Sequence, residues 1–193
     1  MSEGRAHPLP VPATARLRLE PLEPRHAEGL HAALGDAEAM RHWDRPPNPD
    51  LDATRREVAA SAAADPSHHG AWAVVREADG AVLGAVNYHD RWDWQRRASV
   101  GFILARAHHG RGYAREAVGA LLGHLFGALA LHRAEALVDP DNAASLALLA
   151  RLGFRREGVM RERWWRGGAV RDEVALAILA PEWRARHPRY DAC

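Results

Sequence analysis

The sequence predicts one α/β domain, and its first half is expected to be mostly antiparallel. Stretches that alternate between apolar and polar residues, as strands do, are interleaved with stretches of helical spacing. Ala71–Arg76 and Ala81–Tyr88 predict a hairpin that turns at Ala78-Asp79-Gly80. With 193 residues, the chain has the usual length of one domain and is long enough to bury a core.

The N-terminal region is expected to place a leader, a strand and three helices before that hairpin. Residues 1–13 are proline-rich and predict a loose leader, whereas residues 14–183 are expected to form the domain. Residues 184–193 are expected to be a C-terminal tail. The elements predicted before the hairpin are a strand at Arg16–Leu19, a helix over about 25–34, a short helix from Asp36 to near Trp43, and a helix around 51–64.

The second half of the chain is expected to alternate between strands and helices. A polar and aromatic loop is predicted at 89–96 and a strand at 97–104, followed by a helix with apolar residues on one face. Asn142 predicts an N-cap for a further helix, which ends at Gly153. The remaining predicted elements are a short strand at Ala134–Val138 and two final strands at about 154–164 and 171–179, on either side of Gly167-Gly168.

Composition excludes several classes of protein. The net charge is +1 and the arginines are scattered among acidic residues, so the sequence shows no basic cluster that would indicate nucleic-acid binding. Cys193 is the only cysteine, so a disulfide framework is excluded. No apolar run approaches a membrane span and no signal-peptide core is present, so we expect a cytoplasmic protein without a membrane partner. The pairs His68-His69 and His108-His109 lack further ligand residues, so no metal is predicted.

The stretch Val100–Ala117 predicts a binding site for a diphosphate. An apolar strand, a loop with Gly110 and Gly112, and the first turn of a helix follow one another here. The N–H groups at a helix start attract anions, glycine allows a close approach, and Arg111 and Arg115 add positive charge. The chain has no lysine for a Walker loop, and Arg115 stands where a dinucleotide fingerprint needs glycine. From this loop alone, a helix start without a ligand remains the alternative.

Four motifs, in order along the chain, resemble the GNAT acyltransferase superfamily. The resemblance covers residues 14–183, and its last motif is similar to the RimJ/RimL branch of N-acetyltransferases. It implies a central mixed, mostly antiparallel sheet with splayed central strands, flanked by helices. The motifs are His109-Gly110-Arg111-Gly112-Tyr113-Ala114-Arg115-Glu116-Ala117, Asn142-Ala143-Ala144-Ser145, Leu152-Gly153-Phe154, and the stretch 163–174 with the later Pro181-Glu182-Trp183.

The resemblance implies acetyl-CoA as the donor substrate. Its pyrophosphate would bind backbone amides at the helix start, and its pantetheine arm would pair with a strand edge. Asn142 would also hydrogen-bond the pantetheine arm. Many members of the superfamily carry Gln or Arg where Ala107 stands, so one supporting side chain is lost. The residues expected to bind the donor are Phe102, Ile103, Leu104, His109, Gly110, Arg111, Gly112, Tyr113, Ala114, Arg115 and Asn142.

Catalysis is expected to need one group for the leaving thiolate and a base for the acceptor amine. By resemblance, Ser145 lies near the CoA sulfur and stabilises or protonates the thiolate. Some RimL-like enzymes use a glutamate where Trp164 stands here. Glu162, two residues earlier and on the same face of a regular strand, is therefore the first substitute. His89 or Asp90 is the next candidate, and deprotonation relayed through water is the remaining alternative.

The predicted activity is transfer of an acetyl group from acetyl-CoA to a primary amine in a ternary complex. The amine belongs either to a protein N-terminus or to a small molecule, and the protein is expected to be a monomer or homodimer. The alternative function is a non-catalytic module that binds or senses acyl-CoA. The residues expected to line the acceptor pocket are Trp43, Arg45, Tyr88, His89, Trp92 and Trp164.

Overall fold

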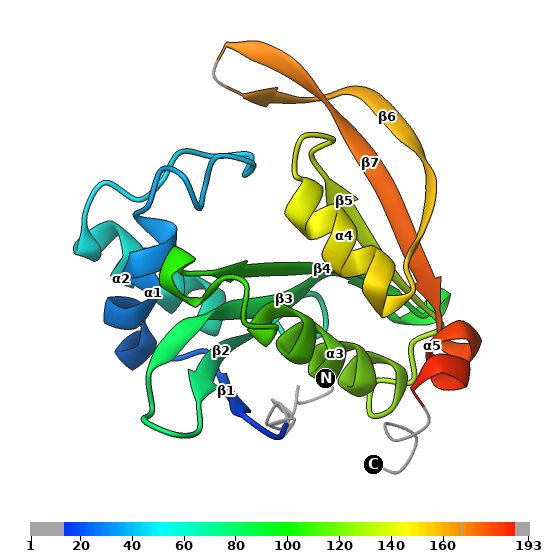
Figure 1. Ribbon diagram of the computed structural model, residues 1–193, viewed down its shortest axis with the longest axis horizontal. Coiled ribbons are helices and arrows are strands. Elements are labelled where there is room, and N and C mark those ends of the chain that lie inside the picture. Colours follow the sequence, from blue (N-terminus) through cyan, green and yellow to red (C-terminus); the bar gives the residue numbers. More distant parts are fainter. Residues whose placement is uncertain (1–13, 167, 188–193) are drawn as a thin grey trace, which may run out of the picture.

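The protein folds around one open sheet of seven strands, in the order β1-β2-β3-β4-β5-β7-β6. The computed structural model describes residues 14–166 and 168–187 (Figure 1). Neighbouring strands run antiparallel except β4 and β5, which run parallel, so the predicted mixed and mostly antiparallel sheet is confirmed. The strands are β1 (Leu17–Pro21), β2 (Gly70–Arg76), β3 (Val82–Trp92), β4 (Arg97–Leu104), β5 (Arg133–Val138), β6 (Arg155–Arg166) and β7 (Ala169–Leu179).

Helices flank this sheet on both faces, as predicted. Side chains alternate between the two faces of a strand. On β4, Val100 and Leu104 pack in the hydrophobic cluster that contains α3, whereas Ile103 packs in the cluster formed with α1 and α2. The helices in the described part of the chain are α1 (Ala27–Leu34), α2 (Leu51–Ala62), α3 (Tyr113–Phe126), α4 (Ala143–Leu152) and α5 (Ala180–Arg186), with short 3-10 helices at Pro24–His26, Asp93–Gln95 and Arg106–His108.

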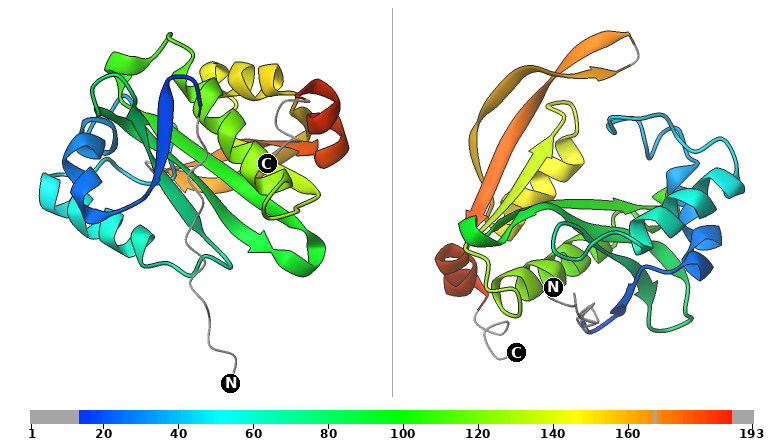
Figure 2. Two further views of the ribbon diagram at one scale, coloured as in Figure 1. Left: turned by 90° about the horizontal axis from the view of Figure 1, so that it is seen from below. Right: turned by 180° about the vertical axis from the view of Figure 1, so that it is seen from behind.

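The centre of the sheet opens because β4 and β5 pair at one end only. Their pairing runs from Arg97↔Arg133 to Ser99↔Glu135 and stops there. Beyond that point β4 stays with β3 as far as Leu104, while β5 stays with β7 as far as Val138. Figure 2 shows β5 rising away from β4 from their shared end. The predicted splay of the central strands is therefore present.

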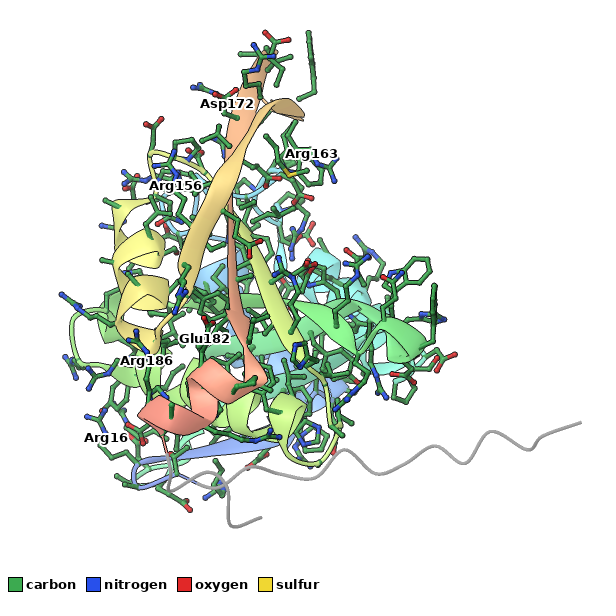
Figure 3. All side chains as sticks on the ribbon, turned by 90° about the vertical axis from the view of Figure 1, so that its right-hand side faces the viewer. Arg16, Arg156, Arg163, Asp172, Glu182 and Arg186 are labelled. Carbon is green, nitrogen blue, oxygen red and sulfur yellow. The ribbon has the colours of Figure 1, made fainter. Side chains whose placement is uncertain are left out.

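Strands β6 and β7 form a long hairpin that extends beyond the rest of the sheet. Figure 3 labels Arg163 and Asp172 toward its outer part. The pairing shifts register between Met160 and Trp164, and Glu162 adopts a left-handed φ of 53°. The Asp172 carboxylate accepts a hydrogen bond from the Glu162 backbone N–H at 2.9 Å. This β-bulge breaks the regular alternation of faces along β6.

Two predicted elements are wrong. The short helix expected from Asp36 to Trp43 is a series of turns, because the Asp36 carboxylate accepts the N–H groups of Glu38 and Ala39 and so closes a turn. The first half of the loop expected at 89–96 is strand, because β3 continues to pair with β4 as far as Trp92, and a 3-10 turn follows at Asp93–Gln95.

The C-terminal part of the described chain contains a helix that local patterns did not reveal. Helix α5 begins directly after β7, and its Trp183 is buried in the main core. It includes residues 184–186 of the expected tail, whereas the expected leader 1–13 and the tail beyond His187 lie outside the described residues. Of the helices in 14–166 and 168–187, none combines the length and apolarity needed to cross a bilayer.

The core holds one buried histidine that links stability to pH. His124 of α3 is 7% exposed and packs edge-on against Trp72, with ring centroids 5.4 Å apart. Its Nε2 has no hydrogen-bond partner among the described residues. Burial, with a smaller contribution from the Arg91 charge, lowers the pKa of His124 to about 4. The imidazole is therefore neutral in the folded protein at neutral pH.

We expect His124 to make the fold sensitive to acid. Unfolding restores an ordinary pKa of 6.5, so its contribution is complete above pH 6.5 and is lost as pH falls toward 4. Between about pH 7.5 and about pH 5 the loss is at most about 2 kcal/mol of unfolding free energy. Urea unfolding of the wild type and His124→Phe at both pH values measures it. The variant should lose less stability on acidification, and equal losses would contradict this assignment.

Candidate active site

A cavity of about 620 Å³ opens where β4 separates from β5. Its walls come from the end of β4, the loop before α3, the first turns of α3 and α4, and the turns that follow α1. Most of the residues predicted to bind the donor lie on these walls. They are Phe102, Ile103, Leu104, His109, Gly110, Gly112, Tyr113, Ala114, Arg115 and Asn142, and Ser145 lies beside them.

The loop before α3 and the first turn of that helix line this cavity. Gly110 and Gly112 adopt φ values of 75° and 80°, in the left-handed region that glycine favours. No side chain caps the start of α3, so its first N–H groups lack partners from the helix. The ring Nε2 of His109 donates to the Leu104 carbonyl at 2.9 Å and ties the loop to the end of β4. An uncapped helix start beside left-handed glycines can bind an anion.

The start of α4 forms the opposite wall. Asn142 is the N-cap, as predicted, because its Oδ1 accepts the Ser145 N–H at 3.1 Å. The Asn142 N–H in turn donates to the Asp139 carbonyl at 2.9 Å. Gly153 ends the helix with a φ of 102°, also as predicted. The Ser145 side chain is thereby fixed on the first turn, at the cavity wall.

Arg111, unlike the other predicted donor residues, does not line the cavity. Its side chain is exposed, and its carbonyl accepts a hydrogen bond from Arg16 at 3.2 Å. Arg16 also pairs with the half-buried Glu116 carboxylate, to which Thr14 donates at 2.7 Å. These contacts attach the N-terminal strand to the first turn of α3, and they orient the loop from outside the cavity.

The predicted acceptor residues do not come together around the cavity. Trp43 lines it, but Arg45 is bound to Glu57 at 2.5 Å. His89 is half-buried on β3 and burial lowers its pKa, but it does not reach the cavity wall. His89 and Arg45 therefore stay predictions that the geometry of the cavity does not support.

Tyr88 and Trp92 lie in different places from those expected. Tyr88 is fully buried in the α3-facing core, and its hydroxyl donates to the Pro66 carbonyl at 2.6 Å. Trp92 ends β3, remains 47% exposed, and lies under the Arg97 guanidinium. Tyr88 pairs with Val100 and points into the core. The pairing then shifts register between His89 and Trp92, where Asp90 adopts a φ of 49°, and Trp92 lies opposite Arg97 at the start of β4, outside the cavity.

Glu162 and Trp164 are separated from the cavity by the bulge in β6. The inference that the two share a face required regular alternation, which the left-handed Glu162 and the register shift interrupt. Glu162 is exposed, whereas the Trp164 indole N–H is buried. Neither residue lines the cavity, so the geometry does not support Glu162 as the base.

The buried Glu173 on β7 lies near Trp164, and sequence patterns did not single it out. It is 9% exposed, and its Oε2 has no hydrogen-bond partner among the described residues. Burial raises the pKa of Glu173, although the nearby Trp164 N–H and the Arg163 charge act in the opposite direction. The charges of Asp44 and Asp139 add to the rise. Glu173 is a titratable group outside the walls of the cavity.

A second group that was not predicted from the sequence consists of His42, Asp139 and Arg166, and it lies across the opening. His42, in the turns after α1, lines the cavity, and its Nδ1 lies 3.2 Å from Oδ2 of the buried Asp139 at the end of β5. Arg166 of β6 contacts the same oxygen at 2.5 Å. Burial alone would raise the pKa of Asp139, but hydrogen bonds from the Asp141 N–H, Arg166 and His42 hold it below its ordinary value. Asp139 is therefore ionised at neutral pH.

A metal is not suggested by the side chains in this region. Within residues 14–166 and 168–187, no three His, Cys, Asp or Glu side chains are grouped so that they could hold an ion. What the cavity offers is an anion site at one end, a hydroxyl at the start of α4, and an imidazole held by a carboxylate across the opening.

Comparison with known proteins agrees with this arrangement. The family profile of the acetyltransferase (GNAT) domain matches residues 16–155. The uncharacterized N-acetyltransferase p20 of Bacillus licheniformis is 30% identical over 172 residues, which cover 88% of this chain and 96% of that protein. The spermidine N(1)-acetyltransferase of Escherichia coli K12 is 25% identical over 177 residues, which cover 92% of this chain and 93% of that enzyme.

Solved structures agree as well. The spermidine N-acetyltransferase from Vibrio cholerae, in complex with CoA and spermine, superposes with a TM-score of 0.78. The match covers 88% of this chain and 99% of that one at 24% identity, and it supports the fold. Together with the family profile, these relatives show that the chain belongs to the GNAT family of N-acetyltransferases.

Proposed function

We propose that this protein transfers the acetyl group of acetyl-CoA to a primary amine by direct attack within a ternary complex, as in the RimJ/RimL branch. One observation carries the proposal: a single cavity joins the uncapped start of α3, the free edge of β4 and the first turn of α4. The three parts match the three parts of the donor, namely its pyrophosphate, its pantetheine arm and its thioester.

The donor is held largely by the backbone in this proposal. The pyrophosphate accepts N–H groups from Gly110 to Ala114, where the helix dipole favours negative charge, whereas the His109 N–H already donates to the Arg106 carbonyl at 3.1 Å. The pantetheine amides pair with the edge of β4 beyond Ser99, where the pairing with β5 has ended. Asn142 caps α4 with its Oδ1, and its amide NH₂ remains available to the pantetheine arm.

The chemistry requires two proton movements and one site for negative charge. An alkylammonium has a pKa of about 10, so the acceptor must lose a proton before its lone pair attacks the thioester carbon. A backbone N–H on the free part of β4 stabilises the oxyanion that forms. As the C–S bond breaks, the Ser145 hydroxyl gives a proton to the thiolate and receives one from the new amide nitrogen.

The acceptor is a primary amine, from either a small molecule or a protein N-terminus. A full-length relative that acts on spermidine supports a small amine, and the resemblance to the RimJ/RimL branch supports an N-terminal amine. The alternative function, an acyl-CoA sensor, would retain the donor site without turnover.

Release of CoA thiol separates these functions. We expect the wild type to release thiol from acetyl-CoA when supplied with at least one amine from a panel of polyamines, amino-acid derivatives and N-terminal peptides. Mass spectrometry should show an acetylated acceptor at the same rate. Tight binding of CoA with no turnover on any amine would support the sensor instead.

Ser145 should affect turnover more than binding. Because its hydroxyl acts on the departing thiolate, Ser145→Ala should lower kcat by about 10²-fold, with little change in the KM for acetyl-CoA. Steady-state kinetics measures both quantities, and CoA-induced thermal stabilisation reports the donor site. Full turnover in the variant would remove Ser145 from the mechanism.

Two substitutions separate the roles of Asn142. Asn142→Ala removes the cap and should lower the unfolding free energy by about 1 kcal/mol, whereas Asn142→Ser retains a neutral cap. If the Asn142 amide also holds the pantetheine arm, both variants should raise the KM for acetyl-CoA by about tenfold. A normal KM in Asn142→Ser would assign the residue to capping alone.

A further inference from the structure

We propose that His42 is the base that accepts a proton from the acceptor ammonium, with Asp139 and Arg166 as its positioning residues. The proposal rests on the acetyl-transfer function above and assigns the step that the donor residues leave open. His42 lines the same cavity as Ser145, and it was not among the site residues predicted from the sequence.

The hydrogen bonds of His42 define its protonation state. The Arg41 Nε donates to His42 Nε2 at 2.8 Å, so Nε2 carries a lone pair and no proton. The proton of the neutral ring is therefore on Nδ1, which donates to Asp139 Oδ2 at 3.2 Å. This is the tautomer that a general base requires, because its free lone pair is on the nitrogen remote from the carboxylate.

Asp139 is well placed to hold this tautomer. Its side chain is 7% exposed and accepts from Arg166 at 2.5 Å and from the Asp141 N–H at 2.8 Å. The same residue accepts the Asn142 N–H with its carbonyl, and Asn142 caps the turn that carries Ser145. A short chain of hydrogen bonds thus connects His42 to the first turn of α4.

Arg41 indicates where the acceptor nitrogen binds. Its guanidinium supplies a cationic N–H to His42 Nε2, the same kind of donor as an alkylammonium. The Arg41 side chain is 55% exposed and pairs with Glu38, which is 50% exposed, so it can leave this position at small cost. An ammonium in its place donates to Nε2 from the cavity side.

The acceptor nitrogen loses two protons during the reaction. The ammonium gives one proton to His42 Nε2, and the resulting amine forms a C–N bond with the thioester carbon. The tetrahedral intermediate loses its second nitrogen proton through the Ser145 hydroxyl to the sulfur as the C–S bond breaks. The products are the amide, CoA thiol and an imidazolium, which Asp139 stabilises until it releases its proton to water.

The other carboxylates and histidines fit this role less well. Glu162 is exposed on the bulge of β6, and His89 stays on β3 outside the cavity wall. Glu173 is buried and titratable, but it too lies outside that wall. Glu38, His108 and His109 also line the cavity. Glu38 pairs with Arg41, the His109 Nε2 donates to the Leu104 carbonyl, and the buried His108 Nδ1 has no hydrogen-bond partner among the described residues, whereas His42 holds a lone pair toward a cationic donor.

Charged groups lie near His42 on several elements. Asp139 follows β5 and Arg166 ends β6, on the far side of the opening. Arg41 and Glu38 lie on its own segment. Arg106 and Arg151 lie on the cavity wall. Within the described part of the chain, Asp139 and Arg41 make the hydrogen bonds to the ring.

Substitution of His42 tests the proposal once the wild type has been shown to acetylate an amine. We expect His42→Gln to lower kcat by about 10² to 10⁴-fold and to remove the acid limb from the pH profile of kcat/KM. CoA-induced thermal stabilisation should stay at the wild-type level. Imidazole in the buffer should restore part of the activity of His42→Ala, which a structural role alone would not produce.

Matched variants make the outcome decisive. His31→Gln changes another half-buried histidine of the same region, hydrogen-bonded to Thr54 at 2.8 Å, and should keep the activity of the wild type. Glu173→Gln should retain the acid limb. A normal pH profile in His42→Gln, or loss of the limb in Glu173→Gln instead, would overturn the assignment. An inactive wild type would overturn the proposed function rather than the assignment of His42.

Discussion

The short parallel pairing between β4 and β5 is the constraint on which the rest of the site depends. Three residue pairs hold the two halves of the sheet together, and beyond them each strand keeps its antiparallel partner. Because a strand edge inside a protein needs hydrogen-bond partners, the opening is suited to a ligand with its own amides. The same separation lets α3 and α4 bring their N-terminal turns to one cavity.

Contacts outside the cavity keep this opening in shape. At Gly84 a side chain would place a Cβ 2.0 Å from the Ile103 carbonyl, so glycine allows β3 to stay close to the end of β4. On the other side of the loop, burial would raise the pKa of Glu116, but hydrogen bonds from Thr14 and Arg16 lower it. The ionised carboxylate thus fixes β1 to the first turn of α3. The donor loop is held at both ends.

Features encoded within a few residues could be predicted from the sequence. The cap at Asn142, the helix end at Gly153 and the glycine loop depend on neighbours three or four residues away, and each lies where it was expected. Asp36 shows the limit of such signals. Its carboxylate accepts backbone N–H groups two and three residues later, and this interaction can close a turn as well as cap the start of a helix. The resemblance carried by these motifs also implied the type of sheet.

Features that depend on register could not be predicted in the same way. Whether Tyr88 faces the core depends on the pairing of β3, and the side chain of Glu162 is redirected by a bulge that no local residue pattern marks. The partner of His42 is 97 positions away in the chain. The residues next to His42 in the sequence therefore do not indicate this contact.

Asp139 shows why the two sides of the opening act together. It joins the segment after α1, through His42, to the end of β6, through Arg166, and its backbone starts the turn that leads to Asn142. Burial raises the pKa of this carboxylate, and the hydrogen bonds from these donors outweigh that effect and lower it. The Asp139 carboxylate in turn accepts from Nδ1 of His42, and Nε2 accepts from Arg41. The first turn of α4 and the segment after α1 are therefore linked through one buried carboxylate.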